Sequence, residues 1–264
     1  MYIAPKKSLG QHWLNSPKAL REMVESAQVS PGDIIVEIGP GKGVLTEALL
    51  ATGAHVVAIE KDNSLIGLLE EKFEKELQNK TLSIISGDIL RFDPETLKTY
   101  GKKYKLVANI PYYITGAIIE QFLSAHFQPE IMVLLMQKEV AERIVSRDTD
   151  KESILSIAVS VYGKPKIISK VPKGAFVPPP KVDSAILCIS SISRDFFADV
   201  DEKTFFSIVK KAFGTKRKQI STSLSEMFGS KKAVEDVLVS IGVDIKARPE
   251  TLSLIQWKGI VKSI

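Results

Sequence analysis

The four residues Asn109-Ile110-Pro111-Tyr112 carry the clearest chemistry in this 264-residue sequence. The side-chain oxygen of Asn109 and the backbone carbonyl of Ile110 are two hydrogen-bond acceptors, and Pro111 would stiffen the turn that aims them. Two such acceptors can bind both hydrogens of an adenine amine and favour the form whose nitrogen lone pair is localised and nucleophilic. The ring of Tyr112 offers a flat face on which the base can stack. The run therefore predicts chemistry on an exocyclic amine, although Asn and Pro also occur in ordinary turns.

A glycine-rich run, Glu37-Ile38-Gly39-Pro40-Gly41-Lys42-Gly43, lies between an apolar segment and a segment with helical spacing. Glycines at such a place let the backbone turn sharply and approach a ligand closely. The spacing of Gly39, Gly41 and Gly43 differs from the Gly-x-Gly-x-x-Gly pattern of dinucleotide sites, where a phosphate rests on the helix N-terminus. It is typical of sites for S-adenosylmethionine, which has no phosphate.

Two carboxylates support a nucleoside site. Glu60 ends the next apolar segment and can accept hydrogen bonds from ribose hydroxyls, and Asp88 ends the one after it and can accept from an adenine amine. Glu60 would serve NAD equally well, and Asp88 could be a helix cap. The run that begins at Asn109 favours S-adenosylmethionine over NAD as the cofactor.

These residues need a scaffold that brings segment ends together. Strands are predicted at residues 33–38, 55–59, 81–86, 104–108 and 131–136, and helices at 44–50, 63–77 and 115–125. This alternation predicts a parallel sheet, and ligands bind such sheets at the carboxyl ends of the strands. Residues 164–171 and 182–189 would add two strands at one edge. We therefore predict an α/β, Rossmann-like sheet with helices on both faces, plus a small C-terminal helical domain.

The sequence pattern changes near residue 192, which predicts a catalytic domain over residues 1–192 and a helical RNA-binding domain over 193–264. Helices are predicted at 202–213, 217–228, 231–241 and 253–262. The last 72 residues hold 13 Lys and Arg against 9 Asp and Glu, most of the net charge of +5. Such a basic region suits a polyanionic partner, although a solvated charged helix face is the plainer interpretation of any one lysine. The candidate phosphate contacts are Lys216, Arg217 and Lys218, with Lys210, Lys211 and Arg248 nearby in sequence.

Several classes of protein are excluded. The single cysteine, Cys188, rules out a disulfide framework and a cysteine-rich zinc site, and we expect no metal. No run approaches the roughly 18 apolar residues of a membrane span, and no apolar run follows the basic N-terminus as in a secretory signal. We expect a cytoplasmic, monomeric protein without a membrane partner.

Several blocks resemble the ribosomal RNA adenine dimethyltransferase family, the small-subunit enzymes linked to kasugamycin sensitivity. The blocks are Lys7-Ser8-Leu9-Gly10-Gln11-His12-Trp13-Leu14-Asn15, Glu37-Ile38-Gly39-Pro40-Gly41, Glu60, Gly87-Asp88, Asn109-Ile110-Pro111-Tyr112, Gln137-Lys138-Glu139-Val140 and Phe176-Val177-Pro178-Pro179-Pro180-Lys181-Val182-Asp183-Ser184. The family often has Asn-Phe at His12-Trp13 and Leu at Ile110.

The resemblance implies transfer of two methyl groups to N6 of each of two adjacent adenosines in the 3′-terminal hairpin of 16S rRNA, and a role in small-subunit biogenesis. It also implies that the N-terminal block closes over the cofactor, with His12 and Leu14 touching it, and that Gly39, Glu60, Asp88 and Asn109 bind it. Phe176, held by the prolines that follow it, is expected to supply the second stacking face for the base.

Three alternatives stay open. The related large-subunit RNA adenine methyltransferases that give macrolide resistance share the Asn109 turn, but the block that ends at Ser184 fits the small-subunit family better. An NAD-dependent dehydrogenase would use Gly39 and Glu60 but leaves the Asn109 turn unexplained. A non-catalytic RNA-binding or assembly factor would not need both Asn109 and Tyr112.

Overall fold

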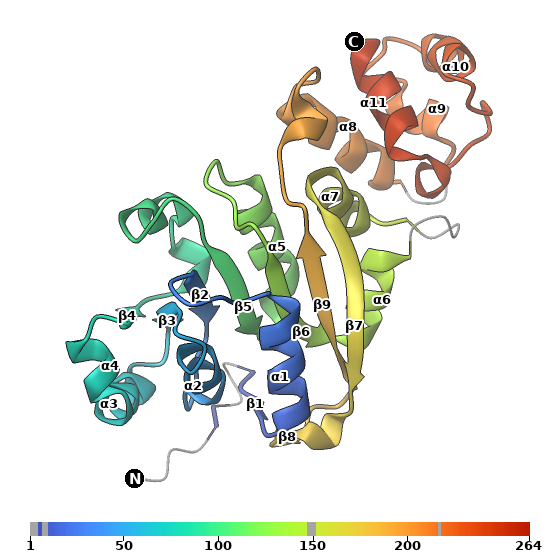
Figure 1. The fold of residues 1–264 in the computed structure, drawn as a ribbon. Coiled ribbons are helices and arrows are strands. Elements are labelled where there is room, and N and C mark those ends of the chain that lie inside the picture. Colours follow the sequence, from blue (N-terminus) through green and yellow to red (C-terminus); the bar gives the residue numbers. More distant parts are fainter. Residues whose placement is uncertain (1–4, 7–9, 147–151, 216–217) are drawn as a thin grey trace. The chain divides into compact units, whose positions relative to one another are not determined.

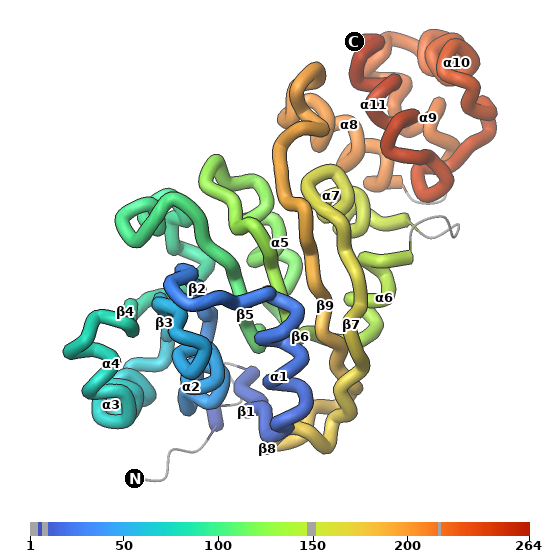
Figure 2. The backbone as a smooth tube through the Cα atoms, viewed as in Figure 1, coloured from blue at the N-terminus to red at the C-terminus, as the bar shows by residue number. Residues whose placement is uncertain are grey.

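A seven-stranded sheet dominates the computed structural model, which describes residues 5–6, 10–146, 152–215 and 218–264 (Figures 1 and 2). The strand order is β4-β3-β2-β5-β6-β9-β7. Neighbours from β4 to β6 run parallel, whereas β9 runs antiparallel to both β6 and β7. The strands are β2 (Ile34–Ile38), β3 (His55–Glu60), β4 (Leu82–Ser86), β5 (Lys105–Asn109), β6 (Met132–Gln137), β7 (Lys164–Val171) and β9 (Ser184–Ser190). The predicted α/β sheet is confirmed, including the two additional strands at one edge.

Helices cover both faces of this sheet. They are α1 (Pro17–Ser26), α2 (Val44–Leu50), α3 (Asn63–Lys72), α4 (Glu74–Gln78), α5 (Thr115–Ser124) and α6 (Lys138–Val145). In Figure 1, α1 and α2 lie in front of the sheet and α5 lies behind it. A parallel sheet has apolar side chains on both faces, so cover on both sides is what its sequence requires.

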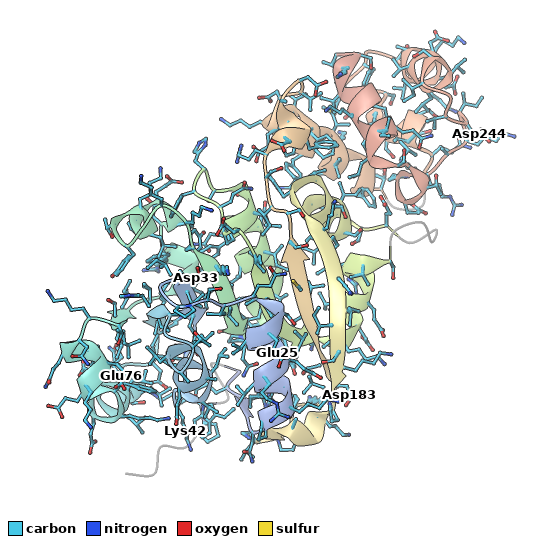
Figure 3. The ribbon with its side chains drawn as sticks, viewed as in Figure 1. Glu25, Asp33, Lys42, Glu76, Asp183 and Asp244 are labelled. Atoms are coloured by element: carbon cyan, nitrogen blue, oxygen red, sulfur yellow. The ribbon has the colours of Figure 1, made fainter. Side chains whose placement is uncertain are left out.

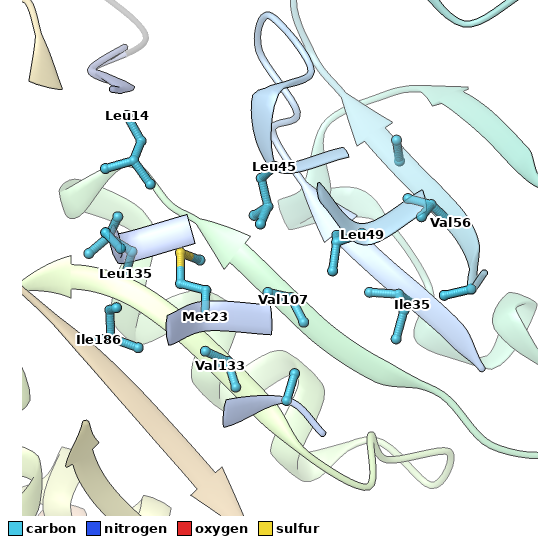
Figure 4. Packing of buried hydrophobic residues seen from close by; sticks show 14 of the residues in the cluster. Leu14, Met23, Ile35, Leu45, Leu49, Val56, Val107, Val133, Leu135 and Ile186 are labelled. Carbon is cyan, nitrogen blue, oxygen red and sulfur yellow. The ribbon is translucent and has the colours of Figure 1, made fainter. Parts of the chain in front are cut away.

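The core between α1, α2 and the sheet fixes the register of the strands. Ile35, Val107 and Val133 project from three neighbouring strands toward Met23 of α1 and Leu49 of α2 (Figure 4). All five side chains are fully buried. Because side chains alternate along a strand, a slip of one residue would turn this apolar set to the other face. The same packing therefore determines which residues stand at the strand ends.

A two-stranded sheet and several 3₁₀ turns complete this part of the fold. Strand β1 (Trp13–Leu14) pairs antiparallel with β8 (Phe176–Val177), with Leu14 opposite Phe176. The 3₁₀ turns are η2 (Ile89–Arg91), η3 (Pro94–Thr99), η4 (Tyr112–Ile114) and η5 (Lys173–Ala175), and η6 (Asp195–Phe197) and η7 (Pro249–Thr251) follow later in the chain. The β1–β8 pair joins the N-terminal block to the segment before the Pro-rich run.

The chain divides into two compact units, one of Met1–Glu142 with Gly163–Ile192 and one of Arg143–Tyr162 with Ser193–Ile264. The second unit contains α7 (Ile154–Tyr162), α8 (Glu202–Phe213), α9 (Ile220–Leu224), α10 (Lys231–Ser240) and α11 (Leu254–Lys262). The boundary predicted at residue 192 would place α7 in the first domain. Its last residue explains the difference, because the Tyr162 ring lies 5.3 Å from that of Phe197 and 6.2 Å from that of Phe206, centroid to centroid.

Two predicted helices differ from the structure. The helix expected over residues 63–77 breaks at Phe73, whose backbone leaves the helical region with φ −116° and ψ 31°. The Phe73 ring packs so closely under Gly43 that a Cβ there would lie 2.4 Å from it. The helix expected over 217–228 is only Ile220–Leu224. Hydroxyl side chains in this segment compete with backbone N–H groups for the carbonyl oxygens, since Ser223 Oγ donates to the Gln219 carbonyl at 3.2 Å.

Candidate active site

The carboxyl ends of four neighbouring strands meet at one edge of the sheet, and four predicted residues stand there. Asp88 follows β4, Glu60 ends β3, Gly39 follows β2 and Asn109 ends β5. All four line one pocket. Because the strands are neighbours in the order β4-β3-β2-β5, the pocket runs along the edge from Asp88 to Asn109. This is where open α/β sheets hold their ligands.

The glycine loop after β2 forms the floor of the pocket. Gly39 and Gly41 have φ values of +64° and +59°, a left-handed conformation that other L-residues adopt only with strain. Gly39 donates its N–H to the Ile59 carbonyl at 2.9 Å, which holds the loop against β3. A Cβ on Gly39 would meet no atom within 4 Å. At Gly39 the loop therefore presents bare backbone to open space, as a close-fitting ligand requires.

Glu60 is held in place by backbone donors. Its Oε2 accepts from Gly41 N at 3.1 Å, and its Oε1 accepts from Asp62 N at 2.7 Å. Burial raises the pKa of Glu60, and the two N–H groups oppose that shift. Each carboxylate oxygen has a second lone pair, so both can still accept a hydrogen bond from a ligand hydroxyl.

Asp88 is an ionised acceptor at the far end of the pocket. Its Oδ1 caps η2 by accepting from Leu90 N at 3.1 Å, and its Oδ2 accepts from Lys61 Nζ at 2.8 Å. The hydrogen bond from Lys61 lowers the pKa of Asp88. The helix-cap interpretation and the ligand interpretation of Asp88 are compatible, because a carboxylate has more than two acceptor sites.

A second carboxyl group, Glu37, lies beneath the glycine loop. It is 1% exposed and its Oε2 accepts from Thr46 Oγ1 at 2.6 Å. Burial raises the pKa of Glu37 to about 8, with a further contribution from the charge of Glu60 and an opposing one from Thr46. Glu37 therefore holds its proton to a higher pH than an exposed carboxyl group does.

The amide of Asn109 has a defined orientation. Its Nδ2 donates to the His12 backbone carbonyl at 3.1 Å, so its Oδ1 is left as an acceptor. The next residue, Ile110, donates its N–H to the Leu135 carbonyl at 3.3 Å, which ties the turn to β6. Pro111 follows with φ −58°. Asn109 and Ile110 both line the pocket, as amine recognition requires.

Tyr112 and His12 form an aromatic wall beside Asn109. The Tyr112 hydroxyl lies 2.7 Å from Ser184 Oγ, and burial raises the pKa of Tyr112, so the phenol is neutral. The His12 ring is nearly parallel to that of Tyr112, with 6.1 Å between centroids and 22° between planes. His12 Nδ1 lies 2.8 Å from the Pro178 carbonyl, which can only accept, so Nδ1 carries the proton. The N-terminal block and the Pro-rich run thus meet next to Asn109.

Asp62 holds Lys6 and Gln11, of which Gln11 lines the pocket. Lys6 Nζ lies 2.6 Å from Asp62 Oδ1, and Gln11 Nε2 donates to Oδ2 at 3.1 Å. Burial acts to raise the pKa of Asp62, but hydrogen bonds from Lys6, Ser64 and Gln11 outweigh it and lower the pKa to about 2. The negative charge of Asp62, two residues after Glu60, therefore holds Lys6 and Gln11 at all ordinary pH values.

The pocket brings together most of the predicted catalytic and cofactor residues. Those that line it are His12, Gly39, Gly41, Glu60, Asp88, Asn109, Ile110 and Tyr112. Leu14 and Phe176 do not line it: they are 7% and 2% exposed and belong to the apolar core. The Phe176 ring therefore offers no face to a base in this conformation. Sequence reasoning gave no role to Trp13, which lines the pocket from the same N-terminal block.

The predicted phosphate contacts are distributed over the second unit. Lys216 and Arg217 lie outside the described residues. Lys210, Lys211, Lys218 and Arg248 are exposed, and Lys211 forms an ion pair with Glu226. The Ile220 N–H donates to the Ala247 carbonyl at 3.0 Å, which brings the segment after Lys218 beside the residue before Arg248. Lys210 and Lys211 lie in the last turn of α8.

The described part of the chain contains no group of three or more His, Cys, Asp or Glu side chains arranged to hold a metal ion. It also contains no helix long and apolar enough to cross a membrane.

The fold and the pocket define a class I, Rossmann-like S-adenosylmethionine-dependent methyltransferase. A dimethyladenosine transferase from Plasmodium falciparum aligns with a TM-score of 0.83 and 25% identity, over 96% of this chain and 97% of that one. The 23S rRNA methyltransferase ErmE aligns with a TM-score of 0.72 and 25% identity, over 95% and 98% of the two chains.

The sequence pattern of the ribosomal RNA adenine dimethylase family matches residues 4–264, and the chain belongs to this family. Ribosomal RNA small subunit methyltransferase A of Dehalococcoides mccartyi is 43% identical over 257 residues, 97% of this chain and 87% of that protein. The protein of the same name from Moorella thermoacetica is 35% identical over 271 residues, 99% of this chain and 93% of that protein. The predicted family and enzyme class are confirmed.

Proposed function

We propose that this chain transfers methyl groups from S-adenosylmethionine to N6 of two adjacent adenosines in the 3′-terminal hairpin of 16S rRNA in the small ribosomal subunit. The orientation of the Asn109 amide carries the proposal. Its Nδ2 is engaged by the His12 carbonyl at 3.1 Å, so Oδ1 is free to accept from the target amine. With the Ile110 carbonyl, it gives two acceptors for the two amine hydrogens.

The residues along the pocket fit the proposed cofactor. Glu60 would accept from the ribose hydroxyls and Asp88 from the adenine amine, and the bare backbone at Gly39 leaves room for the rest of the molecule. S-adenosylmethionine, when bound, supplies a methyl group that its sulfonium charge has already activated. The task left to the protein is therefore orientation and charge stabilisation rather than strong base chemistry.

Tyr112 would stack on the target adenine. Its hydroxyl contact with Ser184 at 2.7 Å fixes the ring beside the acceptors at Asn109. A base must leave its stack, or come from a single strand, to enter such a pocket. Since Phe176 is buried, its predicted role as the second stacking face requires movement of β8.

The second unit would bind the phosphates of the RNA. Support comes from the exposed Lys210, Lys218 and Arg248, and from the excess of basic residues in the last quarter of the sequence. Phosphate contacts give affinity that falls with salt and carry little sequence information. The choice of adenosine would then depend on the pocket of the first unit.

The test is to locate the methyl groups. The chain is incubated with labelled S-adenosylmethionine and small subunits whose 16S rRNA is under-methylated, and the label is mapped by nuclease digestion. Large subunits serve as the control substrate. The proposal expects label on N6 of two adjacent adenosines near the 3′ end of 16S rRNA. Label in the large-subunit RNA, or none on adenine, would overturn it.

A further inference from the structure

The indole of Trp13 forms part of the pocket wall beside the glycine loop. Its Cδ1 and Nε1 atoms lie 3.3 and 3.4 Å from where a Cβ of Gly41 would be. Trp13 and Gly41 both line the pocket. The indole edge that carries the N–H is therefore in contact with the loop over which the cofactor would lie.

The N–H of this indole has no acceptor. Nε1 of Trp13 is buried and makes no hydrogen bond to the described part of the protein. A buried donor without a partner costs free energy, and indole N–H groups usually find a partner when they are buried. The other tryptophan, Trp257, has the same unpaired N–H, but it is fully buried in the helical unit and lines no described pocket. Of the two tryptophans, only Trp13 lines this pocket.

The order of the strand ends indicates which part of the cofactor would supply that acceptor. If Asp88 receives the adenine and Glu60 the ribose, the amino-acid end must lie farther along the edge, over Gly39 and Gly41 and toward Asn109. The only anionic group of S-adenosylmethionine, its carboxylate, is at that end. Lys42 adds positive charge here, with its Nζ 3.9 Å from the centroid of the Trp13 ring (Lys42 is labelled in Figure 3).

We propose that Trp13 Nε1 donates a hydrogen bond to the carboxylate of the methionine part of S-adenosylmethionine, beside the positive charge of Lys42. The inference rests on the proposed function, because the identity of the cofactor is part of that proposal. It makes Trp13 a binding residue that recognises the amino-acid end and distinguishes the cofactor from ligands that lack the carboxylate.

The test compares ligand affinities by calorimetry. Trp13→Phe keeps an aromatic ring and removes only the N–H side of the indole, and Trp257→Phe is the matched control. A hydrogen bond to a charged acceptor corresponds to roughly a 10- to 100-fold change in affinity, so Trp13→Phe should weaken S-adenosylmethionine binding by about that factor. Trp257→Phe should leave it unchanged. For decarboxylated S-adenosylmethionine, Trp13→Phe and the unmodified protein should bind within about twofold of each other.

Stability and fluorescence give independent readouts. Because the N–H has no partner without ligand, Trp13→Phe should lower the melting temperature of the free protein only by what the smaller ring loses in packing, and it should reduce the rise that S-adenosylmethionine causes. In the Trp257→Phe background, the emission of Trp13 should change on addition of S-adenosylmethionine.

The outcomes separate the two proposals. If the unmodified protein binds S-adenosylmethionine and Trp13→Phe binds it equally well, the Trp13 proposal is wrong and the proposed function stands. An equal loss of affinity for the decarboxylated ligand would also overturn the carboxylate assignment. If the unmodified protein binds no S-adenosylmethionine, the cofactor assignment fails and the Trp13 proposal fails with it.

Discussion

Replacing Glu37 with glutamine should stabilise the protein, and increasingly so as the pH rises. Glu37 is 1% exposed, and its pKa rises from the usual 4.5 to about 8 in the folded chain. In the unfolded chain it ionises near its usual pKa. Between these two values the unfolded state releases a proton that the folded state keeps, so the stability of the fold decreases with rising pH.

The size of the effect follows from that difference. At about 1.4 kcal/mol per pKa unit, the carboxyl group costs the fold about 4 kcal/mol by pH 8 relative to pH 4.5. Glutamine cannot ionise, and its side-chain oxygen can still accept from Thr46 Oγ1, which donates to Glu37 at 2.6 Å. Glu37→Gln should therefore match the unmodified protein near pH 4.5 and exceed its stability at pH 8.

Urea unfolding at several pH values between 4.5 and 8.5 measures the difference directly. Glu47→Gln is the control, because Glu47 is on the adjoining helix α2 with 67% of its side chain exposed, paired with Lys72. It should show no comparable trend with pH. A stability difference between Glu37→Gln and the unmodified protein that is constant over this range would show that the pKa of Glu37 is not raised in the folded chain.

Two further predictions concern the substrate. Tyr112→Ala should lower kcat/KM for RNA roughly tenfold or more, because base stacking is lost. Tyr112→Phe loses only the contact with Ser184 and should lower kcat/KM much less. Equal effects of the two substitutions would contradict a stacking role. Charge reversal at Lys216, Arg217 and Lys218 should weaken RNA binding and flatten its dependence on salt, and the affinity for S-adenosylmethionine should not change. If the variant and the unmodified protein bind RNA equally at several salt concentrations, these residues do not belong to the interface.

The strand ends could be predicted because local signals determine them. Apolar runs of strand length end at Gly39, Glu60, Asp88 and Asn109, and a parallel sheet brings such ends to one edge. Helix α1, which was not predicted, has a local signal as well: Ser16 caps it by accepting from Ala19 N at 3.3 Å, and Pro17 occupies its first turn.

The remaining features depend on contacts between distant segments. Phe176 was assigned to the pocket from its place before the prolines, but its pairing opposite Leu14 turns it into the core. The hydrogen bond from Asn109 to the His12 carbonyl joins residues that are 97 positions apart. The break at Phe73 depends on packing against Gly43, and the position of α7 depends on the rings around Tyr162. No local pattern encodes such pairings, because they arise only when the chain is folded.

We expect Asn109 to act on the target amine rather than to stabilise the fold or to bind the RNA. The direct measurement is the single-turnover rate of methyl transfer by Asn109→Ala at saturating RNA and S-adenosylmethionine, with both affinities measured in parallel. Asn79→Ala, at an exposed helix end, is the matched control. Asn109→Ala should transfer methyl groups at least about 100-fold more slowly, as for loss of a hydrogen bond made in the transition state, and should retain its affinity for RNA. A near-normal rate for Asn109→Ala would show that Asn109 does not act on the amine.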